Sequence, residues 1–309
     1  MNSALPRSRS DLHDSAGQAA RYSACQVNQQ VDQLRSLAQI AWSEPNPSLK
    51  CEAVGRLGDA LSALQGNVLA DVTTPEAPAA CDMTAIADAP LKPGRPQRPE
   101  LVLAHKVPRR SAGSPAGLAA LLHSIAHIEF NAINLALDAV WRFNAMPASF
   151  VADWVSVAQD EARHFQMLVH ELQTLDTQYG DFTAHDGLWM MARRTADDLV
   201  ARMALVPRVL EARGLDATPV IQRKLRSAGH DGAVAVLQVI LDEEVRHVAI
   251  GNDWFSRLCL QSGFDPEQRF RELIKSFDAP LPKGPINHDA RLAAGFSQAE
   301  LAWLQQGHD

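Results

Sequence analysis

Tyrosine and cysteine are scarce in this chain, and the cysteines do not occur in pairs. The 309 residues include 2 tyrosines and 4 cysteines, namely Cys25, Cys51, Cys81 and Cys259. Because no two of them form a CxxC motif, a zinc knuckle and a disulfide framework are both excluded. Free thiols in a reducing cytoplasm fit this pattern.

A basic charge balance and long apolar runs are also missing. The net charge is -7, so the whole chain lacks the positive surface typical of nucleic-acid binders. No run of about 18 apolar residues and no secretory signal is recognisable, so we expect no membrane span. P-loop, G-x-G-x-x-G and nucleophile-elbow motifs are absent as well, which leaves the common nucleotide and hydrolase sites without support.

Two local stretches are nevertheless basic. One lies between Lys92 and Arg110, and the other between Arg193 and Arg226. Solvated faces and ion pairs are one interpretation. The alternative is a site for an anionic substrate, so RNA or another phosphate-bearing ligand stays open.

Abundant alanine, leucine and valine predict an all-α protein. Four long segments with helical spacing follow each other, ending near glycine or proline. They indicate a four-helix bundle. The expected helices of the bundle cover residues 116–144, 148–176, 188–213 and 231–261.

The remaining segments divide the chain into further parts. We expect an N-terminal helical extension over 1–70, with helices over 15–43 and 48–70, and a Pro-rich arm or linker over 71–115. The bundle covers 116–262, with an additional short helix over 217–228. Residues 263–309 form C-terminal short helices and a tail. In the arm, Leu101 to Leu103 and Val107 are expected to act as apolar anchors, and near the C-terminus Ser297 and Glu300 form a capping box.

Two long helices carry the same acid-Glu-x-Arg-His pattern. It reads Asp160-Glu161-Ala162-Arg163-His164 in one helix and Glu243-Glu244-Val245-Arg246-His247 in the other. A glutamate and a histidine three residues apart lie on one helix face. Carboxylate and imidazole can then bind one metal ion together. A single E-x-x-H is commonly a surface pair, but two copies flanked by apolar residues predict a buried metal site.

The other two helices of such a bundle should each supply one glutamate. Glu129 lies on an apolar stripe of the first helix. Glu211 is the candidate in the third, although Asp197 or Asp198 could take that face. Glu129 precedes Glu161 by nearly the same interval as Glu211 precedes Glu244, so the chain reads as two similar helical hairpins.

These residues resemble the ferritin-like superfamily of dimetal carboxylate proteins. The matching stretches are HSIAHIEFNAINLALDAVWRF, DEARHF, LEARGLDATP, DEEVRHVAIG, PGRPQRP and LPKGPINHDARLAAGF. Within the superfamily, the chain is similar to an uncharacterised bacterial family related to the tRNA hydroxylase branch. The resemblance covers roughly residues 90–300.

The resemblance implies two iron ions, with manganese or a mixed pair as alternatives. The implied metal ligands are Glu129, Glu161, His164, Glu211, Glu244 and His247. It also implies that Asp160 contacts His247 and that Glu243, where Asp is usual, contacts His164. Such contacts orient the imidazole rings.

The expected function is an O₂-dependent hydroxylase or oxidase of unknown substrate. A separate chain would donate electrons, and a homodimer is an open alternative to a monomer. Non-catalytic iron handling or storage, and a manganese- or iron-dependent peroxide-detoxifying protein, are the alternatives. No catalytic side chain is assigned. We interpret His123 and His127 as polar packing rather than a zinc pair, and Tyr179 as a loop residue that could contact substrate.

Overall fold

A computed structural model describes residues 27–65, 83, 85–86, 89–108 and 114–306. Within them the backbone forms helices, turns and one isolated β-bridge between Leu101 and Ala184. The expected all-α class is therefore confirmed for this part of the chain. The elements are a helix over 27–43, α2 (Pro47–Gln65), η1 (Ala104–Lys106), α4 (Pro115–Arg142), α5 (Ala148–Gln173), α6 (Gly187–Arg194), α7 (Leu199–Leu205), the π-helical turn η2 (Val206–Glu211), α8 (Ala212–Ser227), α9 (Asp231–Gln261), α10 (Pro266–Ser276), α11 (His288–Ala293) and α12 (Gln298–Gln305).

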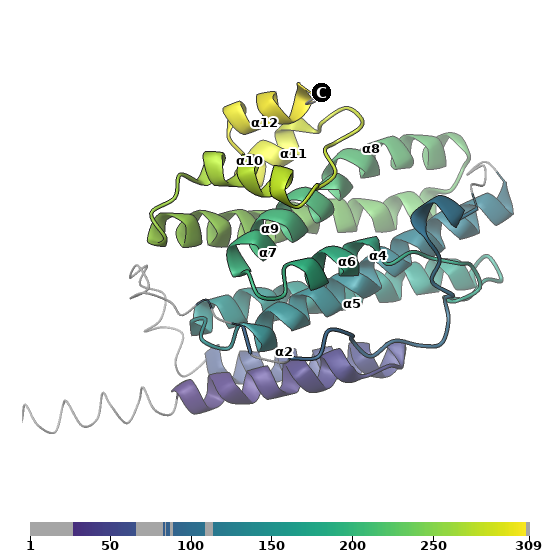
Figure 1. Cartoon of the computed structure of the whole chain (residues 1–309). Coiled ribbons are helices and arrows are strands. Elements are labelled where there is room, and N and C mark those ends of the chain that lie inside the picture. Colours follow the sequence, from purple (N-terminus) through teal and green to yellow (C-terminus); the bar gives the residue numbers. More distant parts are fainter. Residues whose placement is uncertain (1–26, 66–82, 84, 87–88, 109–113, 307–309) are drawn as a thin grey trace, which may run out of the picture.

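The helices are stacked roughly in chain order (Figure 1). α2 packs on α5, and α5 packs on both α4 and α9. The broken segment α7–η2–α8 lies along α9, and the short C-terminal helices α10 and α11 cover α9 from the other end of the stack. α4, α5, α9 and the broken segment thus surround the middle of the molecule.

The central helix is α4. It begins at Pro115, where the Ser114 side chain accepts a hydrogen bond from the Gly117 N–H and proline occupies the first turn. Every residue from Glu129 to Arg142 is buried. α4 contains an 18-residue stretch that is apolar enough to cross a membrane, but 67% of that stretch is buried inside the protein. Its burial within the bundle accounts for its apolar character.

Buried charges connect α4 to the broken segment. Asp138 binds Arg142 at 2.7 Å and Arg202 of α7 at 2.6 Å, and all three side chains are buried. Arg208 of η2 pairs with Glu300 of α12 and lies over the rings of Phe255 and Phe270. Arg202 and Arg208, both in the second basic stretch, therefore form internal ion pairs. This agrees with the interpretation of that stretch as solvated faces and ion pairs.

The helix expected over 188–213 is not continuous, and this prediction was wrong. α6 ends at Arg194, residues 195–198 form a turn, and Asp198 caps α7 by accepting from the Ala201 N–H. The chain then passes through the π-helical turn η2 into α8, which continues past Gly214 to Ser227. The separate helix expected over 217–228 is the end of α8.

The other helices agree closely with the prediction. α4, α5 and α9 match the expected ranges, although α4 ends at Arg142 and α5 at Gln173. The capping box of Ser297 and Glu300 is present at the start of α12. Residues 15–26 and 66–70 of the two expected N-terminal helices lie outside the described residues, and so do Cys25 and Cys81. Cys51 and Cys259 are free thiols.

The described part of the Pro-rich segment lies against the helices. Gly94 donates its N–H to the Trp42 carbonyl at 2.9 Å, and Val102 donates to the Ala184 carbonyl at 2.8 Å. Trp189 donates its Nε1–H to the Leu91 carbonyl at 3.0 Å. Leu101 and Leu103 are exposed, so the expectation that they act as apolar anchors was wrong. Backbone hydrogen bonds hold this segment instead.

Candidate metal centre

Five of the six predicted ligands meet in the middle of the bundle. α4 supplies Glu129, α5 supplies Glu161 and His164, and α9 supplies Glu244 and His247, all of them buried. The i,i+3 spacing places each glutamate and histidine of one helix on the same face. One ligand atom from each of Glu129, Glu161, His164 and Glu244 can be chosen so that all lie within 4.8 Å of one another.

Glu161 lies between the two imidazoles. Its Oε2 is 3.5 Å from His164 Nδ1, and its Oε1 is 3.0 Å from His247 Nδ1. The ring centroids of the two histidines are 5.8 Å apart. The two oxygens of a single carboxylate therefore face two different imidazole nitrogens, as required of a carboxylate that bridges two ions.

The outer glutamates each approach one histidine. Glu129 Oε2 is 3.3 Å from His164 Nδ1, and Glu244 Oε1 is 3.6 Å from His247 Nδ1. Each Nδ1 thus faces two carboxylates, one outer and one central. The cluster has two halves, joined by Glu161.

The other nitrogen of each histidine points at an acid of the opposite helix. His164 Nε2 is 2.6 Å from Glu243, and His247 Nε2 is 3.1 Å from Asp160. Arg163 contacts both acids. An Nε2–H donated to a carboxylate leaves the Nδ1 lone pair directed into the cluster. The structure therefore places Asp160 and Glu243 beside the histidines that the sequence had paired with them.

Glu211, the sixth predicted ligand, occupies the last position of η2. It lies outside the group of four side chains described above, but it borders the same pocket as Glu129 and Glu244. Burial, together with the charges of Glu244 and Glu161, raises the pKa of Glu211 well above its usual value. Asp197 and Asp198 do not take its place, because Asp198 caps α7 and both precede that helix.

The charges of the cluster are unevenly distributed. Burial, followed by the charge of Glu161, raises the pKa of Glu129 well above its usual value. Burial also acts to raise the pKa of Glu161, but contacts with His164 and His247 outweigh it and lower that pKa. The pKa of His164 rises to about 11 because its contacts with Glu129 and Glu161 outweigh burial. Without a metal ion, protons on the histidines and on the glutamates with a raised pKa balance the buried charge.

Several buried donor atoms have no hydrogen-bond partner among the residues that the structure describes. Those of the cluster are both oxygens of Glu161, one oxygen each of Glu211 and Glu244, and Nδ1 of His247, whose 3.0 Å approach to Glu161 Oε1 lacks hydrogen-bond geometry. An unsatisfied buried polar atom costs free energy and requires an explanation. Here the orphaned atoms are oxygen and imidazole nitrogen, the donors that Fe, Mn and Zn accept. The residues present therefore fit a metal site.

Two further histidines of α4, His123 and His127, belong to a separate polar group. His127 Nδ1 is 2.9 Å from the Tyr179 hydroxyl, and His123 Nε2 accepts the Gly180 N–H at 2.9 Å. Tyr179 packs against Phe130 and Phe165, which adjoin Glu129 and His164 in the sequence. These contacts agree with the interpretation of His123 and His127 as polar packing, while His123 Nδ1 and His127 Nε2 have no hydrogen-bond partner among the described residues.

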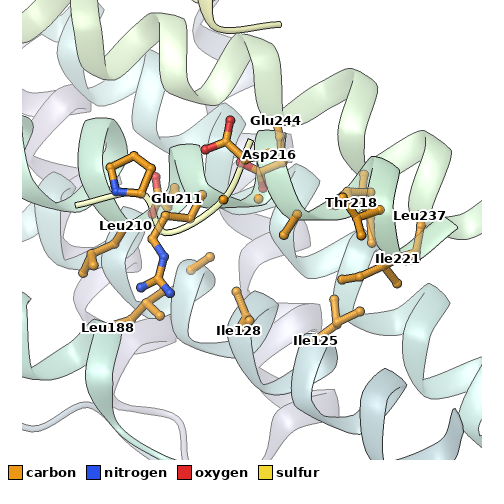
Figure 2. A pocket seen from close by; sticks show the side chains of 18 of the residues that line it. Ile125, Ile128, Leu188, Leu210, Glu211, Asp216, Thr218, Ile221, Leu237 and Glu244 are labelled. Carbon is orange, nitrogen blue, oxygen red and sulfur yellow. The ribbon is translucent and has the colours of Figure 1, made fainter. Parts of the chain in front are cut away.

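A pocket of about 550 Å³ opens onto one side of the cluster. Glu129, Glu211 and Glu244 lie at its inner end, while Ile125, Ile221 and Leu237 line one wall. Figure 2 shows Glu211 and Glu244 next to each other, with Leu188 and Leu210 on the opposite wall. The sequence analysis did not identify this pocket, because its walls come from five separate segments.

The close approach of η2 to α9 depends on a glycine. A Cβ atom built at Gly251 would lie 2.4 Å from both Cβ and Cγ of Pro207. We expect Gly251→Ala to lower the free energy of unfolding by about 1–3 kcal/mol, as overpacking does, and to displace Glu211. Urea denaturation would measure the change.

Gly214→Ala is the matched control. It lies in α8, and a Cβ there meets nothing within 4 Å. Alanine in a helix interior is favoured over glycine by roughly 1 kcal/mol, so this variant should be at least as stable as the wild type. Equal stability of the two alanine variants would show that η2 does not need the space at Gly251.

Comparison with known proteins gives a family but no activity. The model of the family "Protein of unknown function (DUF455)" matches residues 43–302. A Haemophilus influenzae protein described as "Uncharacterized protein" is 51% identical over 218 residues, which cover 68% of this chain and 76% of that protein. No solved structure matches. The matched range contains all six predicted ligands.

Proposed function

The chain belongs to DUF455, a family of unknown function, and we propose that its buried cluster holds two divalent iron ions for O₂-dependent oxidation of a small molecule. Glu129 and His164 would hold one ion, and Glu244 and His247 the other. Glu161 would lie between the ions, and Glu211 would complete the set. On this proposal the protein is a ferritin-like dimetal carboxylate protein.

Charge supports two divalent ions rather than one. When ionised, the three buried glutamates and the half-buried Glu211 carry four negative charges, which two divalent cations would neutralise while both histidines stay neutral. Buried charges are stabilised when they are paired or bound to metal. The two imidazole nitrogens favour iron, manganese or zinc over calcium and magnesium, which prefer oxygen. Manganese would serve the same ligands.

The single observation that favours an enzyme over iron storage is the pocket. It brings an apolar space of substrate size to the carboxylates. When bound, a pair of iron ions supplies the electrons and the Lewis acidity for O₂ reduction. Hydroxylation combines one O₂ and one C–H bond with two electrons and two protons, and yields one C–OH group and one water. A separate redox protein would donate the electrons.

The residues of the chain have defined tasks in this reaction. Asp160 and Glu243 keep His164 and His247 oriented toward the cluster. The apolar walls exclude water from the inner end and hold the substrate against Glu129 and Glu244. Glu211, with one oxygen free of hydrogen bonds, can change its position without breaking a contact.

The test mixes anaerobically iron-loaded protein with O₂ and follows O₂ consumption and the ultraviolet-visible spectrum. An enzyme should consume one O₂ per pair of iron ions, stop, and resume when a reductant is added. Iron uptake continuing far beyond two ions per chain would instead indicate storage. A manganese-loaded protein that evolves O₂ from peroxide would indicate the detoxifying alternative.

Asp160→Asn should weaken metal binding without removing it. The amide keeps the size of the side chain, but it is a poorer acceptor for the His247 Nε2–H. Loss of such a contact commonly lowers metal affinity about 10–100-fold. A competition titration with a coloured chelator would measure the affinity. Asp153→Asn on the same helix, where the carboxylate instead accepts from Trp254, should leave it unchanged. The same affinity in both variants would contradict the role given to Asp160.

A further inference from the structure

The pocket beside the cluster has a closed inner end and a charged mouth. Glu129, Ala132 and Ile240 are buried at the inner end. Arg213, His185 and Lys283 line the same pocket and are exposed. The three come from α8, from the turn before α6 and from the segment after α10. The polarity of the pocket therefore changes along its length.

The walls between these ends are apolar. They are formed by Ile125, Ile128, Leu188, Leu210, Ile221 and Leu237, which Figure 2 shows on the two sides of the cavity. Ile128 is 42% exposed although it borders the pocket, so apolar surface is left uncovered there. A volume of about 550 Å³ is in the range of pockets that enclose drug-sized ligands. A flexible or flat apolar body would fill it.

The cations at the mouth have no acidic partner. Among the ion pairs within 4.0 Å in the described part of the chain, none involves Arg213 or Lys283. Besides the three glutamates at the inner end, Asp216 lines the pocket, and Arg291 binds it at 2.7 Å. Its charge is therefore matched within the fold. The mouth keeps an excess of positive charge opposite the carboxylates at the inner end.

We propose that the pocket binds an amphipathic anion, with an apolar body toward the cluster and one anionic head at Arg213 and Lys283. Arg213 and Lys283 attract an anionic head, and burial at the inner end disfavours a charged group, so the head faces outward. This orientation places a carbon of the apolar body, remote from the head, next to the metal ligands. The proposal rests on the proposed function only for the fate of that carbon, and the binding itself does not require metal.

Calorimetric titration of the full chain, treated with a chelator, tests the binding. The probes are dodecanoate and dodecyl phosphate, each below its micelle concentration, and dodecanol below its solubility limit. Both anions should bind more tightly than the alcohol. The stronger of the two anions identifies the head as a carboxylate or a phosphate. Because the chelator removes any metal, binding of these probes does not depend on the metal proposal. The metal proposal is tested separately, by the metal content per chain.

Variants locate the site. Arg213→Gln and Lys283→Gln should each weaken both anions about threefold, the size of a partly exposed ion pair, and leave dodecanol unchanged. Arg223→Gln is the control, because Arg223 is an exposed arginine of the same helix that does not line the pocket. Ile221→Trp, which fills the cavity, should abolish binding of all three probes. Circular dichroism checks that each variant folds.

Two results would overturn the proposal. If the alcohol binds as tightly as the anions, or if Arg213→Gln and Arg223→Gln have equal effects, the mouth does not recognise the head. If no probe binds, or if Ile221→Trp binds all three as the wild type does, the apolar body does not enter this pocket.

Discussion

Glu161→Ala is expected to remove both metal ions from the protein. Glu161 is the carboxylate whose two oxygens face His164 and His247, so each half of the cluster loses a ligand. The loss in affinity should exceed the roughly 100-fold that removal of a supporting contact costs. Metal content after iron loading and gel filtration would fall close to zero, while the helical circular dichroism signal persists.

Two further variants make this result specific. His247→Ala removes a ligand from one half and should lose at least one ion. Glu171→Ala, on the same helix as Glu161 but outside the cluster, should keep both. Full metal occupancy in Glu161→Ala would mean that Glu161 is not a ligand. If Glu161→Ala loses the helical circular dichroism signal, metal content is measured instead in Glu161→Gln, which keeps the size of the side chain.

Asp138→Ala is expected to cause the largest loss of stability. The substitution leaves Arg142 and Arg202 buried without their carboxylate. Breaking a buried ion pair by removing one partner costs about 3–5 kcal/mol, because the remaining charge is uncompensated. Urea denaturation followed by circular dichroism would measure the difference in unfolding free energy.

An exposed ion pair provides the control for Asp138. Asp253 binds Arg257 at 2.8 Å on the surface of α9, where the Asp253 side chain is 52% exposed. Exposed pairs contribute at most about 1 kcal/mol, so Asp253→Ala should change stability little. An equally small change in unfolding free energy for Asp138→Ala would contradict this account. It would mean that Arg142 and Arg202 reach solvent, and that the ion pair between Asp138 and Arg202 does not hold α4 to α7.

The sequence was sufficient to predict which side chains of the continuous helices come together. Glu161, His164, Glu244 and His247 lie on α5 and α9, where a fixed period of 3.6 residues converts spacing into a common face. Glu129 could be found because it is an acid on an otherwise apolar stripe. In each case, local geometry alone determines the direction of the side chain. The contacts of Asp160 and Glu243 with the histidines were expected from the family resemblance, not from periodicity.

The position of Glu211 could not be predicted in this way. Its segment contains Pro207, and a π-helical turn shifts the direction of every later side chain relative to a regular helix. The signal in the sequence was indirect. Gly251 lies one turn after His247, and its missing side chain makes room for Pro207. Only the packing of the two helices relates these residues.

The pocket was also beyond prediction from one sequence. Its walls combine residues near 125–132, 210–221 and 237–244 with the segment 282–285. Periodicity describes single helices, but a cavity depends on how several helices cross. The basic stretch around Arg213 did suggest an anionic ligand. The structure separates Arg202 and Arg208, which are internal, from Arg213, which lies at the mouth.

Metal content per chain tests the central claim most directly. Purified wild-type protein is loaded anaerobically with Fe(II), freed of excess metal by gel filtration, and analysed by mass spectrometry together with its protein concentration. The account predicts two iron ions per chain, and fewer than one in Glu161→Ala. Folded wild-type protein that retains neither iron nor manganese would contradict it, and the buried carboxylates and histidines would then be a structural ion-pair network.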